Sequence, residues 1–503
     1  MTPIDAADVE RFRALLGQLL GLASERDTVE PLEVVLRERV AATRAGDVRA
    51  YLSGLESGAL AGEGRALATR VTIGETYFHR HPTSLRAFVS AVVPDRVAAR
   101  AGERTLSILS AGCSTGAEPY TLAMLVRELP ELAGWDVRIR GVDIDADAIE
   151  QARRGRFSTW QLREMAPEAQ ARWFTPRGPR EVELDPAIRG MVDFEVRNLV
   201  EPDPAFFRPG AFDVIFCRNV VMYFERATTA ALVERFATAL APDGFLFLGH
   251  AETLRGLSHD FTLHQAEDAF YYQRRPGLET RAPSLLRATA APRPGERDAS
   301  WVDAIGQAAG RLAALVPGGA VAVAGTSAVR ASDGASRARR RRALELLQDE
   351  RFTEALDALG SGAPEADDDG DAELLRAVLL TNLGRVDDAV AVCERLLAAD
   401  DLDASVHYLM ALCREAAGDV ADAARHDRAA VYLDPGFAMA RLHLGLLAKR
   451  AGDLAAAKKE LGEALVLLAR EDAARIALLG GGFRREALIR LCQSELRAAG
   501  GTP

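Results

Sequence analysis

A repeat of 34 residues runs through the C-terminal third of the chain and restricts what this part can fold into. Glycines recur with this period, and alanines follow them with the same period: Gly384, Gly418 and Gly452, then Ala389, Ala423 and Ala457. Glycine tolerates the backbone conformation of a tight turn, and alanine lets two helices approach closely. Because both residue types recur together, the pattern predicts a stack of helix–turn–helix units.

The repeat resembles the tetratricopeptide pattern, which has the same period. Ala355 extends the alanine series backwards, with Glu350 at the glycine position, so four units are expected over residues 338–503. The stretch LDPGFA at 433–438 supplies a turn between units, and the helix REALIRLCQSEL is expected to cap the stack. The resulting α-solenoid would offer a concave face to an unknown protein partner. A plain helical bundle is the alternative.

The first half of the chain has a different pattern. Residues 1–80 carry apolar residues at helical spacing and are expected to form an N-terminal helical domain. From 81 to 275, strand and helix patterns alternate, which predicts an α/β fold with a doubly wound, mostly parallel sheet. Residues 157–197 interrupt the alternation, and a small β insertion is expected there, with bounds at 157–192. The stretches APDGFLFLGHAE and DAFYYQRR are expected to close the sheet as an antiparallel pair.

Residues 276–337 are rich in Pro, Ala, Gly and Ser and are expected to form a flexible linker, with one weak helix at 301–316. The arginine run SRARRRR at its end is typical of a solvated helix start. A formal charge of −11 argues against a general nucleic-acid binder. The five cysteines form no CxxC pair, which favours free thiols in a reducing compartment. Without a signal peptide or a long apolar run, the chain is expected to be cytoplasmic, with no membrane insertion.

The stretch ILSAGCSTGAEPYTLAM, residues 108–124, has the pattern of a strand, a glycine-containing turn and a helix. Gly112 and Gly116 would let the backbone approach a ligand, but their spacing differs from that of a dinucleotide-binding loop. Asp143 ends the next predicted strand, where it can accept hydrogen bonds from ribose hydroxyls. Glu118 would repel a pyrophosphate and attract a cation such as S-adenosylmethionine. The helix dipole would favour the same acid without any ligand, so the loop alone leaves both interpretations open.

Five stretches together resemble the motif series of the chemotaxis receptor methyltransferases, within residues 5–275: TIGETYFHR, SAGCSTGAEPYTLAM, GVDIDADAIEQARRGRF, VRNLVEPDP and FDVIFCRNVVMYF. These enzymes methylate glutamates on chemoreceptors. The resemblance implies a class I methyltransferase sheet, S-adenosylmethionine as the cofactor and the helical bundle of a chemoreceptor as the partner. The product would be a glutamate methyl ester. The repeats after residue 338 resemble the tetratricopeptide extension of a subset of this family.

The resemblance also assigns residues to a site. The residues implied to bind the cofactor are Gly74, Thr76, Arg80, Gly112, Glu118, Asp143, Asn198, Leu199, Arg218 and Asn219. Glu118 would hold the ammonium group and Asp143 the ribose. Tyr223 and Arg80 are implied to be catalytic, with Tyr223 beside the transferring methyl group and Arg80 near the methionine carboxylate. The alternative for Arg80 is an ion pair with a surface acid.

Asn198 and Leu199 would flank the adenine, and Arg218 and Asn219 would close the site from the fourth strand. Both asparagines have an alternative role as turn formers, to which asparagine is prone. Tyr223 lies in the apolar stretch VVMYF and has an alternative role as a packed core aromatic.

Two positions depart from the family pattern: Gly74 replaces a common Asn, and His79 replaces a common Phe. His79 and His81 have no matching cluster of acids or cysteines, so no metal site is predicted. His250 and Glu252 end a predicted strand and are expected to line a substrate cleft.

Recognition of the protein substrate is implied by a basic helix that carries Arg37, Arg39 and Arg44, although an ordinary exposed helix face explains these residues equally well. A glutamate acceptor, with a reference pKa of about 4.3, is ionised near neutral pH, so the reaction needs no general base. Two other functions stay open: a small-molecule methyltransferase of the same fold, and a tetratricopeptide scaffold that only senses the cofactor.

Overall fold

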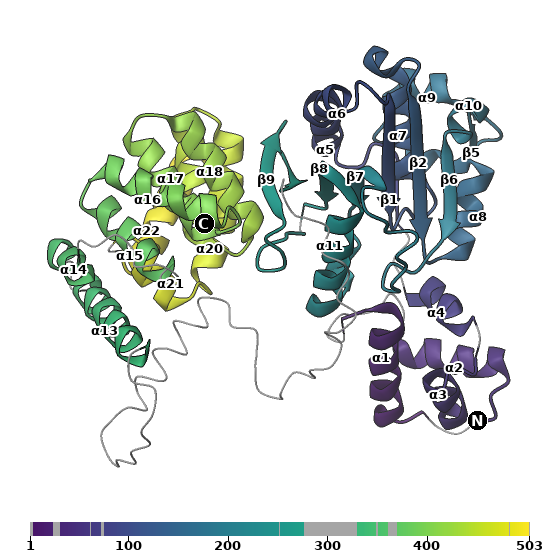
Figure 1. The fold of residues 1–503 in the computed structure, drawn as a ribbon, viewed down its shortest axis with the longest axis horizontal. Coiled ribbons are helices and arrows are strands. Elements are labelled where there is room, and N and C mark those ends of the chain that lie inside the picture. The colour runs from purple at the N-terminus through teal and green to yellow at the C-terminus, as the bar shows by residue number, and fades with distance from the viewer. Residues whose placement is uncertain are drawn as a thin grey trace. The chain divides into compact units, whose positions relative to one another are not determined.

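The computed structural model describes residues 4–23, 31–60, 62–71, 75–250, 252–275, 329–348, 351–360, 370–481 and 483–501 (Figure 1). The chain divides into two compact units, Met1–Pro283 and Ser284–Pro503. A sheet dominates the first unit, and the second consists of helices. In these described ranges, no helix combines the length and the apolar character needed to cross a bilayer.

The first unit begins with a group of helices: α1 (Ala6–Leu20), α2 (Leu32–Thr43), α3 (Val48–Glu56) and α4 (Glu63–Val71). Asp5 and Asp8 form a capping box at the start of α1, and apolar residues of all these helices meet in one core. Arg39 donates to both carboxylate oxygens of the buried Glu63, at 2.7 and 2.8 Å, and the Tyr51 hydroxyl donates to the same carboxylate at 2.7 Å. The helices predicted from the amphipathic pattern are therefore confirmed.

Among the described residues, seven strands form the main sheet in the order β6-β2-β1-β7-β8-β10-β9. Their bounds are β1 Thr105–Ala111, β2 Asp136–Asp143, β6 Val192–Val196, β7 Phe212–Cys217, β8 Leu240–Leu248, β9 Phe261–Ala266 and β10 Ala269–Arg274. Strands β6, β2, β1, β7 and β8 pair in parallel, and β10 pairs antiparallel with both β8 and β9. Every residue of the central β7 is buried, as expected for a strand covered on both faces. The predicted fold class is confirmed.

Helices connect these strands and cover the sheet (Figure 1). Their bounds are α5 Pro82–Ala87, η1 Phe88–Val92, α6 Val93–Ala99, α7 Ala117–Glu128, η2 Pro130–Leu132, α8 Ala146–Arg154, η4 Val221–Tyr223 and α11 Arg226–Ala239. Because β1 and β2 run parallel and in register up to Ala111 and Val142, the loop after β1 and Asp143 at the end of β2 lie at the same edge.

The β insertion is a separate three-stranded antiparallel sheet in the order β3-β5-β4. Its elements are β3 Arg156–Ser158, η3 Thr159–Leu162, α9 Pro167–Trp173, β4 Phe174–Pro176, β5 Glu181–Leu184 and α10 Pro186–Arg189. The expected extent of the interruption, to residue 197, was too long. Residues 192–196 form β6, which pairs in parallel with β2 at the edge of the main sheet. The sequence pattern also missed β9.

The second unit contains paired helices: α13 Val329–Gln348 and α14 Phe352–Leu359, α15 Gly370–Asn382 and α16 Val386–Ala399, α17 Ala404–Ala416 and α18 Val420–Leu433, α19 Ala438–Arg450 and α20 Leu454–Leu468, then α21 Ala473–Leu479 and α22 Arg485–Ala498. Residues 329–337, expected to belong to the linker, are part of α13. The weak helix expected at 301–316, the rest of the linker up to residue 328 and Glu350 lie outside the described residues.

The glycines and alanines of the repeat have the roles that their spacing predicts. Gly384, Gly418 and Gly452 have φ angles of 69°, 85° and 82°, in the left-handed region that favours glycine, and each lies between two paired helices. The alanines of the repeat are fully buried between those helices: Ala355, Ala389, Ala423 and Ala457. Helix α22 covers the predicted capping stretch, whereas α21 was not anticipated.

Candidate active site

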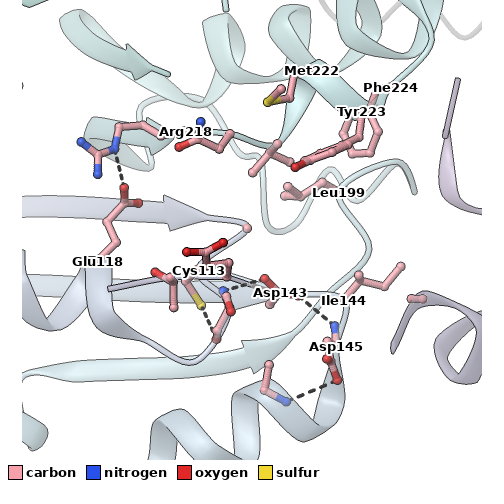
Figure 2. Close-up of a pocket in the computed structure, with 18 of the residues that line it drawn as sticks. Cys113, Glu118, Asp143, Ile144, Asp145, Leu199, Arg218, Met222, Tyr223 and Phe224 are labelled. Atoms are coloured by element: carbon pink, nitrogen blue, oxygen red, sulfur yellow. Dashed lines mark hydrogen bonds and ion pairs between the residues drawn. The ribbon is translucent and has the colours of Figure 1, made fainter. Parts of the chain in front are cut away.

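A cavity of about 500 Å³ opens at the carboxyl edge of the parallel strands (Figure 2). Loops that follow β1, β2, β6 and β7 line it, together with residues of α1 and α4. The predicted site residues that line it are Thr76, Arg80, Gly112, Glu118, Asp143, Asn198, Leu199, Arg218, Asn219 and Tyr223. Gly74 lies outside the described residues. One cavity thus brings together predicted residues that are distant in sequence.

Both glycines of the loop after β1 are required by close packing. Gly112 has a φ of 75°, and a Cβ atom there would lie 2.3 Å from the Val220 side chain. Gly116 has a φ of 89°, and its Cβ would lie 2.9 Å from Ala152. The absence of a side chain at Gly112 therefore lets the loop after β7 close over the loop after β1.

The carboxylate of Asp143 is held in one orientation by backbone amides. Its Oδ2 accepts a hydrogen bond from the Ser114 N–H at 2.7 Å, and its Oδ1 accepts one from the Asp145 N–H at 2.9 Å (Figure 2). Burial raises the pKa of Asp143, and these backbone hydrogen bonds oppose that rise. The remaining lone pairs can accept hydrogen bonds from a ligand's hydroxyl groups.

Glu118 is paired with a cation of the protein. Its Oε2 accepts a hydrogen bond from Arg218 Nε at 2.7 Å (Figure 2). Its Oε1 accepts one from the Ser110 hydroxyl at 2.8 Å. In this ion pair, the Glu118 side chain is 12% exposed and the Arg218 side chain is 3% exposed. A cationic ligand would therefore have to share this carboxylate with Arg218, a partner that the sequence pattern did not indicate.

The pocket wall also contains buried donors that lack acceptors. Within the described part of the chain, Arg80 Nε and Arg218 Nη1 have no hydrogen-bond partner. Arg80 Nη1 donates to the Glu75 carbonyl at 3.2 Å, and Arg218 Nη2 donates to the Arg80 carbonyl at 2.9 Å. Unsatisfied buried N–H groups are costly, so these two positions suit an anionic ligand group such as a carboxylate.

The chemistry of the pocket fits S-adenosylmethionine. Two carboxylates, Glu118 and Asp143, can accept hydrogen bonds from an ammonium group and from ribose hydroxyls. The unpaired donors of Arg80 and Arg218 can bind the methionine carboxylate. Leu199 adds an apolar wall (Figure 2).

Asn198 also has the structural role that was left open. Its side-chain oxygen accepts a hydrogen bond from the Val200 N–H at 3.0 Å, which forms a turn, and its Nδ2 donates to the Leu19 carbonyl of α1 at 3.1 Å. Asn219 has a φ of 60° at the start of the loop after β7. Both asparagines thus shape the backbone around the pocket.

Glu252 supports the loop after β7 and does not line the cavity, contrary to expectation. Its buried carboxylate accepts hydrogen bonds from four backbone N–H groups, at distances of 2.6 to 3.0 Å: those of Asn219, Val220, Met222 and Gly249. No spacing in the sequence indicates this role. His250, two residues earlier, does line the cavity.

The segment after α1 pairs with the same loop. The Ala23 N–H donates to the Tyr223 carbonyl at 2.9 Å, and the Glu225 N–H donates to the Gly21 carbonyl at 2.9 Å. Tyr223 is half-buried and lines the cavity, as Leu199 does (Figure 2). It is therefore not a residue of the closed core, the alternative that the apolar stretch left open.

The histidines near the pocket differ in their surroundings. His79 does not line the cavity, and burial lowers its pKa. The ring centroids of His81 and His250 are 4.9 Å apart, and burial, together with nearby Arg218, lowers the pKa of His81 to about 4. In the described ranges, no cluster of His, Cys, Asp and Glu has the arrangement of a metal site.

Of the arginines considered for substrate recognition, Arg39 is bound to the buried Glu63 and serves the core of the helical group. Arg37 is about half exposed and pairs with Glu33 on the same helix. Arg44 ends α2 with a φ of 55°.

Comparison with known proteins adds independent information. The family model described as CheR methyltransferase, SAM binding domain, matches residues 74–270, and a tetratricopeptide repeat model matches residues 346–413. A probable biofilm formation methyltransferase WspC of Pseudomonas putida is 30% identical over 453 residues, which covers 90% of this chain and 96% of that protein.

Two other relatives match about half of this chain. Chemotaxis protein methyltransferase 2 of Vibrio cholerae is 33% identical over 259 residues, which covers 51% of this chain and 89% of that protein. The chemotaxis protein methyltransferase of Escherichia coli is 32% identical over 260 residues, which covers 51% of this chain and 88% of that protein.

Proposed function

Because this chain belongs to the CheR methyltransferase family, we propose that it transfers methyl groups from S-adenosylmethionine to glutamate side chains of chemoreceptors. The product is a glutamate methyl ester. The relatives named as chemotaxis protein methyltransferases support a receptor as the substrate. S-adenosylmethionine is the methyl donor of the family.

One observation carries the assignment of the site. Glu118 and Asp143 offer acceptors, and Arg80 and Arg218 offer buried donors without partners, in one cavity. An amino acid zwitterion attached to a ribose needs both kinds of group. A purely anionic or purely cationic ligand would satisfy only one of them.

The protein acts by binding and orientation. When bound, S-adenosylmethionine supplies an electrophilic methyl group. Asp143 holds the ribose hydroxyls, Glu118 holds the ammonium group and Arg80 holds the methionine carboxylate. Asn198 and Leu199 form the wall of the pocket on the adenine side.

No residue has to remove a proton from the acceptor, because a glutamate with a reference pKa of about 4.3 is ionised near pH 7. Tyr223 orients the acceptor carboxylate, and Arg80 orients the donor. Leu20, Leu22 and the loop after β7 exclude water from the cavity. Alignment and desolvation are the effects by which such a site accelerates transfer between opposite charges.

The second unit acts as a binding module in this proposal. Its match to the tetratricopeptide repeat family supports interaction with another protein. Every residue that lines the cavity lies in the first unit.

The proposed function is tested by incubating the full chain with methyl-labelled S-adenosylmethionine and the cytoplasmic fragment of a chemoreceptor. Label should appear in the fragment, be released by mild base, and be lost when the acceptor glutamates are changed to alanine. Label in small molecules alone would indicate a small-molecule methyltransferase. Binding of the cofactor without transfer to any receptor fragment would indicate a sensing scaffold.

A further inference from the structure

Aromatic rings and guanidinium groups alternate between the surface of the β insertion and the cavity. The Arg163 guanidinium carbon lies 3.4 Å from the centroid of the Trp160 ring and 3.8 Å from that of the Tyr77 ring. The Arg80 guanidinium carbon lies 5.5 Å from the centroid of the same Tyr77 ring. We call Trp160, Arg163, Tyr77 and Arg80 the cation–π column.

The column begins at the surface and ends in the pocket. Trp160 is 53% exposed, although it is a large hydrophobic residue. Tyr77 and Arg80 line the cavity. An exposed aromatic residue that adjoins a binding pocket is typical of a contact surface for a partner.

Hydrogen bonds hold the column against the wall of the cavity. The Phe78 N–H donates to the Gln161 carbonyl at 2.9 Å, which joins η3 to the segment that carries Tyr77. Gln161 Nε2 donates to the Thr115 hydroxyl at 3.2 Å, in the loop after β1. A protein segment that contacts Trp160 would therefore be placed against a fixed edge of the pocket.

The charges of the column favour an acidic partner. Arg163 contributes a positive charge beside Trp160. Glu75 lies 3.8 Å from Arg163 and is 60% exposed, so water screens this pair and Glu75 offsets the charge only weakly. Each cation–π contact stabilises its geometry by about 0.5–2 kcal/mol, so Arg163 is held in the angle between its two rings, whose planes are inclined by 72°. The fixed guanidinium can still interact with a carboxylate at its edge.

We propose that the cation–π column is the docking surface for the acceptor segment of the protein substrate. An acidic segment packs an apolar side chain on Trp160, Arg163 attracts its carboxylates, and the reacting glutamate enters the cavity beside Arg80. This proposal rests on the proposed function and adds the surface that selects the substrate.

The test uses Trp160→Ala and Arg163→Ala in the full chain. Trp160→Ala should lower kcat/KM for a receptor fragment at least about tenfold, mainly through KM, because exposed aromatic anchors dominate such contacts. Arg163→Ala should act in the same direction, and Arg163→Lys should be intermediate, since lysine keeps the charge but cannot stack as a plane.

Affinity for S-adenosylmethionine, measured by calorimetry, should change less than about twofold in these variants, because none of the changed side chains is needed for the cofactor contacts. Phe483→Ala is the matched control, since Phe483 is an aromatic of similar exposure, 56%, in the second unit. It should leave kcat/KM for the fragment unchanged.

Unchanged kcat/KM in Trp160→Ala would overturn the proposal. An equal loss of cofactor affinity would also overturn it, since the column would then only support the cofactor pocket. Calorimetric binding of the receptor fragment separates this proposal from the proposed function. If the wild type binds the fragment without methylating it, the proposed function is wrong, and the column is judged by whether Trp160→Ala weakens that binding at least about tenfold. If the wild type does not bind the fragment, the docking proposal is wrong.

Discussion

At the scale of single residues, the pairing of Glu118 with Arg218 neutralises one carboxylate of the pocket. The pair is almost fully buried, so its charges are screened little by water. A bound ammonium group would convert this pair into a three-membered cluster of alternating charge. We therefore expect the cofactor's ammonium group to bind a carboxylate that the protein already orients.

We predict that Glu118→Gln weakens the binding of S-adenosylmethionine by roughly ten- to 100-fold, because a hydrogen bond to a charged group contributes about 1.5–3 kcal/mol. Calorimetry measures this change, and thermal unfolding checks that the fold is retained. Ser110→Ala removes the other hydrogen bond to Glu118 but keeps the charge, so its effect should be smaller. Unchanged affinity in Glu118→Gln would show that the charge argument is wrong.

Glu252 leads to a second prediction at this scale. Glu252→Ala leaves four backbone N–H groups beneath the loop without their acceptor, and each buried unsatisfied group costs about 1–3 kcal/mol. The variant should unfold at a lower temperature and lose most of its methyl transfer, since Asn219 and Tyr223 lie on that loop. Glu252→Asp keeps the charge on a shorter side chain and should be less harmful. Full activity in Glu252→Ala would rule out a supporting role.

At the scale of elements, the end of α1 links the helical group to the loop that carries Tyr223. Gly21 has a φ of 72°, and a Cβ there would lie 2.7 Å from Thr228 and 2.8 Å from Val200. Gly58 has a similar φ of 70°, but a Cβ there would meet nothing within 4 Å. A comparison of alanine substitutions at these two glycines therefore separates the cost of backbone strain from the cost of a steric clash.

We predict that Gly58→Ala costs about 1–2 kcal/mol, the strain of a left-handed residue, and leaves methyl transfer unchanged. Gly21→Ala should cost more than this and also reduce methyl transfer, because the clash displaces the segment that pairs with the loop at Tyr223. Chemical denaturation and a methyl-transfer assay measure the two effects. Equal behaviour of the two variants would contradict the role given to Gly21.

The second unit contains a chain of buried histidines, and hydrogen bonds to their neighbours determine which ring nitrogens carry a hydrogen. His407 Nε2 lies 3.0 Å from the Asp401 carbonyl oxygen. Because a carbonyl can only accept a hydrogen bond, Nε2 must carry the hydrogen. His407 Nδ1 must then accept from His426 Nδ1, at 2.9 Å, and His426 Nε2 accepts from Arg425 at 2.9 Å. Both rings are therefore neutral, and a further proton would place two donors face to face.

The three histidines of this unit together contribute most to stability near pH 6.5. Burial lowers the pKa of His407, and it lowers that of His426 to about 3. Their contribution to stability is therefore present above the pKa of a histidine in the unfolded chain and is lost as the pH falls below it. Burial alone would lower the pKa of His443, but contacts with Asp427 and Glu415 outweigh it and raise the pKa to about 9. That contribution is present below about pH 6.5 and is lost as the pH rises toward 9.

Thermal unfolding of the full chain from pH 4 to pH 9.5 measures this dependence. The alkaline loss should be on the order of 3 kcal/mol, and His443→Gln should remove it. A wild-type stability that stays constant between pH 6.5 and 9 would contradict the assignment of a charged His443.

Edge strands also show where sequence patterns fail at this scale. The central strands β1 and β7 were predicted, because most of their residues are apolar. In the structure, most of these residues are buried. Strand β6 was assigned to the insertion, and β9 was missed. Both are edge strands with mostly half-buried residues, so their sequences lack the apolar run of a central strand.

At the scale of the whole molecule, the repeat and the strand–helix alternation predicted both architectures, since each is a periodic property of the chain. Gly112, Glu118 and Asp143 were predicted from the strand–turn–helix pattern, because parallel strands place their carboxyl ends at one edge. The other predicted cavity residues were implied by the resemblance to the methyltransferase family. Leu20 and Leu22 were not predicted to line the cavity. They reach it through tertiary pairing of Leu22 with Phe224, about which local sequence carries no information.

The measurement that tests the central claim most directly is tandem mass spectrometry of a chemoreceptor fragment after incubation with the full chain and S-adenosylmethionine. The wild type should add methyl esters to glutamate side chains, and Asp143→Asn, which weakens the ribose contact, should add few or none. Methyl groups on other residue types, or none at all with a wild-type chain that binds the cofactor, would contradict the assignment as a protein-glutamate methyltransferase.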